Sequence, residues 1–192
     1  MTSILKVDTI QDTDGNNIIN ESGNTITIGA SGDTTNIIGT LQNDGAAVGG
    51  ANTPYFRAVL SSNQNTTNGT ATKVQFDTEE FDTGNEYDNS SNYRFVPANG
   101  NTYCIIANVG MEGSSATTLQ EARIKLYKNG SEVFENRTDP YNNSNNKINV
   151  GLQSFVTGNG SDYYEIYASI YVSSGTARAR SQSSFSAFKL IT

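Results

Sequence analysis

The densest group of side chains that could do chemistry is the acidic segment FDTEEFDTGNEYD, residues 76–88. It carries six carboxylates within twelve residues: Asp77, Glu79, Glu80, Asp82, Glu86 and Asp88. Paired carboxylates can cleave a glycosidic bond, and several carboxylate oxygens together can bind calcium. Because so dense a run of acids usually forms a solvated loop, a glycan depolymerase is the least favoured function. Calcium stays a candidate cofactor, with Asp77, Asp82 and Asp88 as its ligands, although their spacing differs from that of an EF-hand loop.

The rest of the chain offers little to an enzyme. The sequence contains no histidine, which is the commonest general base, the activating base of Ser and Cys triads and a usual zinc ligand. Its single cysteine, Cys104, therefore has no histidine to activate it, and we expect it to be a small buried residue of a strand. The sequence predicts a protein that is not an enzyme and that needs no other cofactor.

Charge and hydropathy argue against two classes of partner. The formal net charge is −7 at pH 7, whereas a protein that binds a phosphate backbone needs clustered Lys and Arg. The sequence has no run of about 20 apolar residues, the length that crosses a bilayer, and the apolar run near residue 5 is too short for a signal peptide. We therefore expect no nucleic-acid partner, no membrane insertion and synthesis in a cytoplasm.

Aromatic residues divide the chain at residue 54. None of the Phe and Tyr residues lies in residues 1–53, so this segment cannot build a core of its own. Ile19, Ile28, Ile38 and Val48 recur at spacings of nine, ten and ten residues, with Gly- and Asn-rich turns between them. Short strands at such a spacing gain stability by stacking on copies of themselves. The pattern favours an intertwined β-stalk of several identical chains, with a disordered polar tail as the alternative.

Residues 54–192 have the pattern of one all-β domain. Apolar and polar residues alternate in segments such as YFRAVLS, TYCIIANVGM and YYEIYASIYVSS, which are separated by clusters of Gly, Asn and Ser. Asn129-Gly130 between two such segments predicts a tight hairpin turn. About eight strands at this spacing, with no helical segment, predict an antiparallel two-sheet sandwich of jelly-roll type.

Five motifs follow one another in this domain: FRAVLS, KVQFDTEEFDTGNEYD, YRFVPANGNTY, LYKNGSEV and FSAFKL. In order and spacing they resemble the globular domain of complement C1q and its tumour-necrosis-factor-like relatives. The resemblance implies a jelly roll that assembles as a tight homotrimer, with its first and last strands paired near the base. Since aromatic side chains favour buried sites, six of them are expected in the core or between subunits: Phe56, Phe76, Phe95, Tyr103, Phe185 and Phe188.

The first segment carries a second resemblance. SILKVDTIQDTDGNNIINESGNTITIG is similar to the N-terminal segments of virion appendage proteins from marine tailed bacteriophages, notably those that infect cyanobacteria. A trimeric stalk topped by a trimeric jelly roll is also the layout of many phage fibres. The resemblance implies a virion fibre of the tail-fibre type, which attaches to other virion proteins through residues 1–53. A capsid decoration, head-fibre or tail structural protein without a receptor role is the alternative.

Receptor contact is expected at the end of the domain away from the stalk. Because antiparallel strands alternate in direction, counting back from the last strand places the loops near 173–183, 136–146 and 97–101 at that end. A ring face and amide groups there could bind a bacterial surface glycan, and two arginines could pair with an anionic group on it. These predicted receptor residues are Tyr141, Asn142, Asn143, Asn145, Arg178 and Arg180.

Overall fold

The computed structural model describes residues 38–39, 42–43, 46–47, 52–116, 118–140 and 146–190. The chain divides into two compact units, residues 1–48 and 49–192. In the first unit, β1 (Gln42–Asn43) pairs antiparallel with β2 (Ala46–Ala47). The expected β-stalk at residues 1–53 lies almost entirely outside the described residues, so the stalk stays a prediction.

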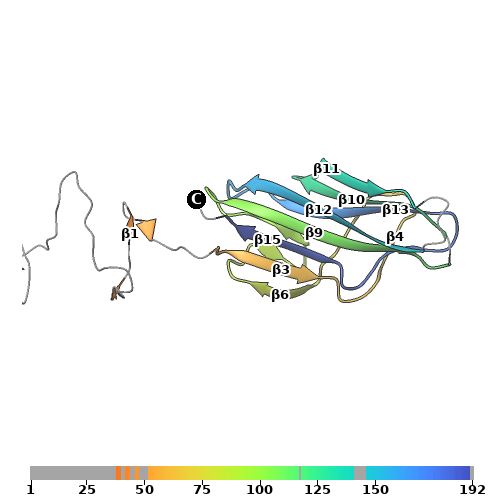
Figure 1. The fold of residues 1–192 in the computed structure, drawn as a ribbon, viewed down its shortest axis with the longest axis horizontal. Helices are drawn as coiled ribbons and strands as arrows, with labels where there is room; N and C mark the ends of the chain where they lie inside the picture. Colours follow the sequence, from red (N-terminus) through yellow and green to blue (C-terminus); the bar gives the residue numbers. More distant parts are fainter. Residues whose placement is uncertain are drawn as a thin grey trace, which may run out of the picture. The chain divides into compact units, whose positions relative to one another are not determined.

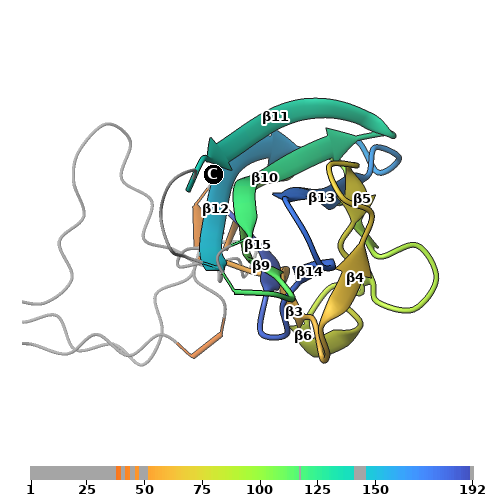
Figure 2. The ribbon, with the colours of Figure 1, turned by 90° about the vertical axis from the view of Figure 1, so that its right-hand side faces the viewer.

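Two antiparallel sheets form the second unit (Figures 1 and 2). The seven-stranded sheet has the order β4 (Gln64–Thr66), β14 (Ala177–Ala179), β9 (Thr102–Gly113), β15 (Ser184–Lys189), β3 (Tyr55–Val59) and β6 (Thr78–Asp82), and β12 (Lys147–Thr157) pairs with β9. The six-stranded sheet has the order β11 (Ser131–Thr138), β10 (Leu119–Lys128), β13 (Tyr164–Val172), β8 (Arg94–Phe95) and β7 (Tyr87–Asp88), and β5 (Thr72–Lys73) pairs with β13. The described residues contain no helix long and apolar enough to cross a membrane.

The alternating pattern of the sequence explains why the two sheets close on one core. In β9 every second residue from Tyr103 to Met111 is fully buried, and in β13 every second residue from Tyr164 to Val172 is buried as well. Successive side chains of a strand point to opposite faces of its sheet, so each sheet turns one apolar face inward. The two inward faces meet in a single core, as an antiparallel sandwich requires.

The hairpin between β10 and β11 has the predicted turn. Lys128 pairs with Ser131 across it, and the two residues between them have positive φ, 51° at Asn129 and 79° at Gly130. Asn and Gly tolerate this left-handed conformation better than other residues, so the sequence at the turn sets the register of the two strands.

Aromatic rings fill one region of the core. Phe56 stacks on Tyr87 with ring centroids 4.8 Å apart and meets Phe185 edge-on at 5.1 Å. The structure buries five of the six aromatic residues singled out in the sequence: Phe56, Phe76, Phe95, Tyr103 and Phe185. Phe188 is only half-buried, because Phe185 and Ala187 take the inward positions of β15. Residues three apart in a strand point to opposite faces, so Phe188 is not a core residue, and its other predicted position, between subunits, stays a prediction.

The first and last strands of the sandwich pair, and the end where they begin and finish is called the base below. β15 runs antiparallel to β3, and Lys189 N donates to Pro54 O at 3.0 Å. The opposite end, called the far end, carries the turn at residues 173–176 and the start of β12. Ser114 N donates there to Thr176 O at 2.8 Å, and Gly113 N donates to Asn146 O at 3.0 Å.

Loop 97–101 lies at the base, not at the far end as predicted. Gly100 N donates to Gly158 O at 3.1 Å, and Leu190 N, at the end of the last strand, donates to Thr102 O at 2.8 Å. Three strands, β9 to β11, separate this loop from the start of β12. An odd number of antiparallel strands places the two connections at opposite ends of the sandwich, which is the physical reason for the correction.

Candidate functional site

The acidic segment does not form a single site. Asp77 accepts hydrogen bonds from Ser61, at 2.8 Å from the backbone N and at 2.6 Å from Oγ. Asp82 accepts from Gly84 N at 3.0 Å and from Tyr87 N at 2.8 Å. Each carboxylate thus caps the backbone of its own turn or of a neighbouring strand, which is a common use of Asp in loops.

The third predicted calcium ligand, Asp88, is used in the same way. Its two carboxylate oxygens accept from the backbone N of Ser90, Ser91 and Asn92 at 2.8–3.1 Å. These bonds hold the pKa of Asp88 well below its usual range, and the bond from Ser91 N has the largest effect. Among the described residues no group of three or more His, Cys, Asp or Glu is arranged to hold a metal ion. The structure therefore does not bring Asp77, Asp82 and Asp88 together, and calcium stays an untested prediction.

The single cysteine is buried in the middle of the seven-stranded sheet. Cys104 is 1% exposed, and its Sγ lies 3.2 Å from Gln153 Nε2 on the neighbouring strand β12. Its side chain belongs to the outward face of the sheet, because Tyr103 and Ile105 on either side of it point into the core.

An apolar patch covers the base half of that outward face. Tyr55, Phe188, Cys104 and Phe155 form one row across four adjacent strands, since Phe188 is paired with both Tyr55 and Cys104, and Cys104 with Phe155. Directly paired residues project to the same side of a sheet. Phe81 on β6 joins the row, edge-on to Tyr55 at a ring-centroid distance of 5.3 Å. These five residues are called the apolar patch below.

The apolar patch contains rings that a monomer would leave in water. Phe155 is 65% exposed and Phe81 44% exposed, and Phe81, Tyr55 and Phe188 line a hollow of about 280 Å³. Neither Phe81 nor Phe155 stands out in the sequence, because each sits among polar residues, in TEEFD and GLQSF. Their position in the strand could have identified them. In an alternating strand, an aromatic residue at a position between the buried residues lies on the outer face of the sheet.

The predicted receptor residues fall into two groups. Tyr141, Asn142, Asn143 and Asn145 lie outside the described residues, in the segment between Pro140 and Asn146. The two arginines are described, but they lie on the sheet and not in a loop. Arg178 is the middle residue of β14, between β4 and β9, and Arg180 follows directly after this strand.

Arg178 and Arg180 share one carboxylate on the outward face, in the half toward the far end. Ala177 and Ala179 are buried, so the two arginines alternate outward with them. Arg178 Nη1 lies 3.8 Å from Glu112 Oε1, and Arg180 Nε lies 3.3 Å from Glu112 Oε2. Both arginines therefore occupy one face of the sheet, and their carboxylate partner was not predicted from the sequence.

Glu112 is a buried charge on β9 with more than these two partners. It is 6% exposed, its Oε2 lies 3.7 Å from Lys147 Nζ on β12, and its Oε1 accepts from Asn63 Nδ2 at 3.3 Å. Acidic residues are rarely so buried unless they are paired. The sequence signal was a lone Glu in the apolar strand YCIIANVGMEG.

Comparison with known proteins shows the fold of this chain. No family model matches it, and no curated protein matches its sequence. Among solved structures, the globular domain of zebrafish complement 1qA protein is similar, with a TM-score of 0.52 and 14% sequence identity. The match covers 72% of this chain and 97% of that one. The all-β sandwich is therefore C1q-like, as its motifs implied.

Proposed function

We propose that this chain is the protomer of a homotrimeric phage virion fibre, of the tail-fibre type, which recognises a host surface and is not an enzyme. In this proposal residues 1–53 attach the fibre to other virion proteins, and the C1q-like domain presents its far end to a bacterial surface glycan. The protein is synthesised in the host cytoplasm and resides in the virion. The observation that carries the proposal is the apolar patch on the outer face of a C1q-like sandwich.

In this proposal a second protein surface buries the apolar patch. Fully burying one Phe side chain contributes about 1.5–3 kcal/mol, and contiguous exposed rings on a soluble protein mark an interaction surface. Two observations support copies of the same chain as the cover. The fold is similar to the complement 1qA globular domain, and the five ordered motifs resemble a family of homotrimers. Identical chains present identical patches, which a cyclic arrangement can bury together.

The far end is well separated from the apolar patch. Cys104 lies in the patch and Gly113 ends the same strand at the far end, so nine residues of extended chain, about 30 Å, separate them. An assembly through the patch leaves the turn at 173–176 available to a ligand. Three copies of a weak site could act together, and such avidity can add ~10²–10⁴ to the affinity.

A panel of immobilised bacterial surface polysaccharides, probed with the labelled full chain, tests the receptor role. We expect saturable binding to some of these polysaccharides, and at least about tenfold weaker binding after Tyr141→Ala together with Asn143→Ala. Asn99→Ala is the matched control, because Asn99 is an exposed amide in the loop at the base. Absence of any bound polysaccharide, or equal binding by both variants, counts against a receptor role and in favour of a purely structural fibre or capsid decoration.

A further inference from the structure

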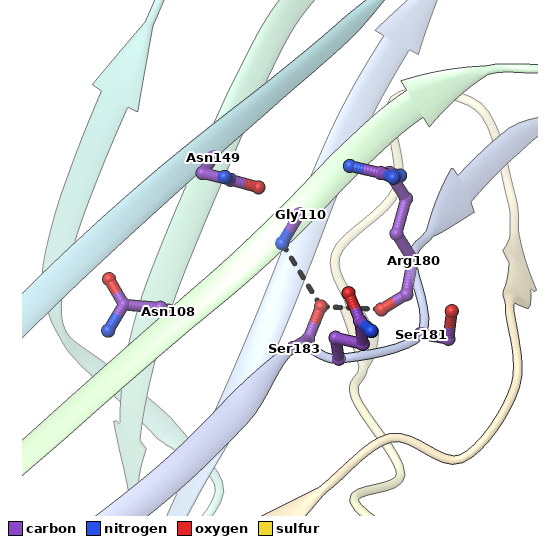
Figure 3. Close-up of a pocket in the computed structure, with 7 residues that line it drawn as sticks. Asn108, Gly110, Asn149, Arg180, Ser181 and Ser183 are labelled. Atoms are coloured by element: carbon purple, nitrogen blue, oxygen red, sulfur yellow. Dashed lines mark hydrogen bonds between the residues drawn. The ribbon is translucent and has the colours of Figure 1, made fainter.

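A polar hollow of about 230 Å³ lies on the outward face of the seven-stranded sheet, between β9, β12 and the turn after β14. Figure 3 shows Asn149 and the side chain of Arg180 on opposite sides of Gly110, which forms the floor. A Cβ atom at Gly110 would lie 2.9 Å from Asn149 Oδ1 and 3.3 Å from Arg180 Cβ. The hollow therefore depends on the missing side chain at Gly110.

Hydrogen bonds fix the backbone of Arg180 beside this floor. Arg180 N donates to Gly110 O at 2.8 Å, Gly110 N donates to Ser183 Oγ at 3.0 Å, and Ser183 Oγ donates to Arg180 O at 2.6 Å. Ser183 is 3% exposed, so this three-residue network is shielded from water. A binding group held in place before the ligand arrives loses less entropy on binding.

The charged side chains beside the hollow carry more positive than negative charge. Arg178, Arg180 and Lys147 all lie near Glu112, which is their one acidic neighbour within ion-pair distance among the described residues. Three cations that share one carboxylate leave an excess of two positive charges. This excess stands out in a chain whose net charge is −7, and an anion entering the hollow would balance part of it.

We propose that the hollow binds an oxyanion, that is, a carboxylate, sulfate or phosphate group, between the Arg180 guanidinium and the Asn149 amide. A guanidinium presents a planar fork of N–H donors that matches the oxygens of these groups. Asn149 turns its Oδ1 toward the floor at Gly110, so a flip of this side-chain amide, which exchanges Oδ1 and Nδ2, is the step by which it adds a further donor. The inference deepens the proposed function, because acidic sugars of a bacterial surface carry such groups. The inference rests on that function only where it identifies the oxyanion as part of a host sugar, since a free oxyanion can fill the same hollow.

Titration calorimetry on the full chain tests the proposal with three probes: inorganic sulfate, inorganic phosphate and glucuronate. Glucose and sodium chloride at matched ionic strength are the neutral and ionic controls. Arg180→Met removes the charge and keeps an unbranched apolar stem, while Gly110→Ala fills the floor. Arg137→Met is the matched control variant, because Arg137 is a half-exposed arginine on β11 that pairs with Asp139.

We expect saturable binding of at least one oxyanion to the wild type and to Arg137→Met, and at least about tenfold weaker binding to Arg180→Met, since hydrogen bonds to charged groups are among the strong ones. Binding of glucuronate identifies a sugar carboxylate as the source, whereas binding of sulfate or phosphate alone identifies a substituent of that type. Absence of saturable binding by all three probes overturns the proposal, and so does equal binding by Arg180→Met and Arg137→Met. Neither result depends on a trimer or on a host glycan, so failure here is distinguishable from failure of the proposed function.

Discussion

Phe188, the last aromatic residue of the chain, lies directly opposite Tyr55, the first, where β15 pairs with β3. Both side chains project from the outward face of the seven-stranded sheet, and Tyr55 also contacts Phe81. The first and last strands of the domain thus build one half of the apolar patch, which Phe155 on β12 extends. Any molecule that covers the whole patch must contact the first and last strands at once.

Phe155→Ser is expected to weaken self-association without unfolding the domain. Phe155 is 65% exposed, so its replacement changes the stability of a single chain by only about 0.5 kcal/mol, while a trimer interface loses the most exposed ring of the apolar patch. Light scattering across a dilution series should show dissociation at a higher protein concentration than in the wild type. Val133→Ser, at a 54% exposed position on β11, is the control and should leave the dilution profile unchanged. Equal profiles for all three proteins would place the interface elsewhere.

The core and the surface should respond very differently to loss of a ring. Phe185 is fully buried among Phe56, Phe76 and Tyr87, so Phe185→Ala is expected to lower the free energy of unfolding by about 3–5 kcal/mol. Phe134 on β11 is 44% exposed, and Phe134→Ala is expected to cost about 1 kcal/mol or less. Urea denaturation measures both values. Similar losses for the two variants would mean that β15 does not lie against the core as described.

Glu112→Gln is expected to leave three cations without their shared carboxylate. Because Glu112 is 6% exposed, we expect the free energy of unfolding in sodium chloride to fall by about 1–3 kcal/mol. If the neighbouring hollow takes an oxyanion, replacing chloride by sulfate should restore more stability to this variant than to the wild type. Glu132→Gln, which removes a more exposed partner of Lys125, is the control for the general effect of sulfate on folding. An equal gain in both variants would contradict a local effect.

Acid should reveal the role of Asp88. Hydrogen bonds depress the pKa of Asp88 in the folded state below its ordinary value of 3.8, and the bond from Ser91 N contributes most. A carboxyl with a depressed folded pKa stabilises the fold above the unfolded pKa, and this contribution is lost as the pH falls from about 4 toward the folded pKa. Asp88→Asn should therefore be less stable than the wild type at neutral pH, with a gap that narrows on acidification. Denaturant titrations at several pH values measure the gap, with Asp139→Asn as the exposed control; a constant gap down to about pH 2 would contradict this role.

The fold was predictable because its signals are local. Alternation in β9 and β13 and the Asn129-Gly130 turn depend on neighbours in the sequence, and the structure confirms both. Both phenylalanines of FSAFKL were expected in the core or between subunits without a distinction between them, but a strand repeats every two residues, so Phe188 faces away from the core that Phe185 enters. The rule that separates the two residues is itself local.

The candidate sites were harder to predict because they join distant segments. Arg178 alternates correctly with its buried neighbours, but Glu112 precedes it by 66 residues and meets it only through the pairing of β14 with β9. The acidic segment is the opposite case, because residues that are close in the sequence do not form one site. Its carboxylates are close in the sequence, yet Asp77, Asp82 and Asp88 each satisfy backbone groups of their own turns or of an adjacent strand, which density of charge alone does not reveal.

The mass of the full chain in solution tests the central claim most directly. Multi-angle light scattering on the purified protein should give three times the chain mass of 20.6 kDa, because the apolar patch is proposed to be buried between three copies. A mass of 20.6 kDa at the same concentration would leave Phe81 and Phe155 in water. It would contradict the homotrimeric fibre from which the proposed avidity for a host surface follows.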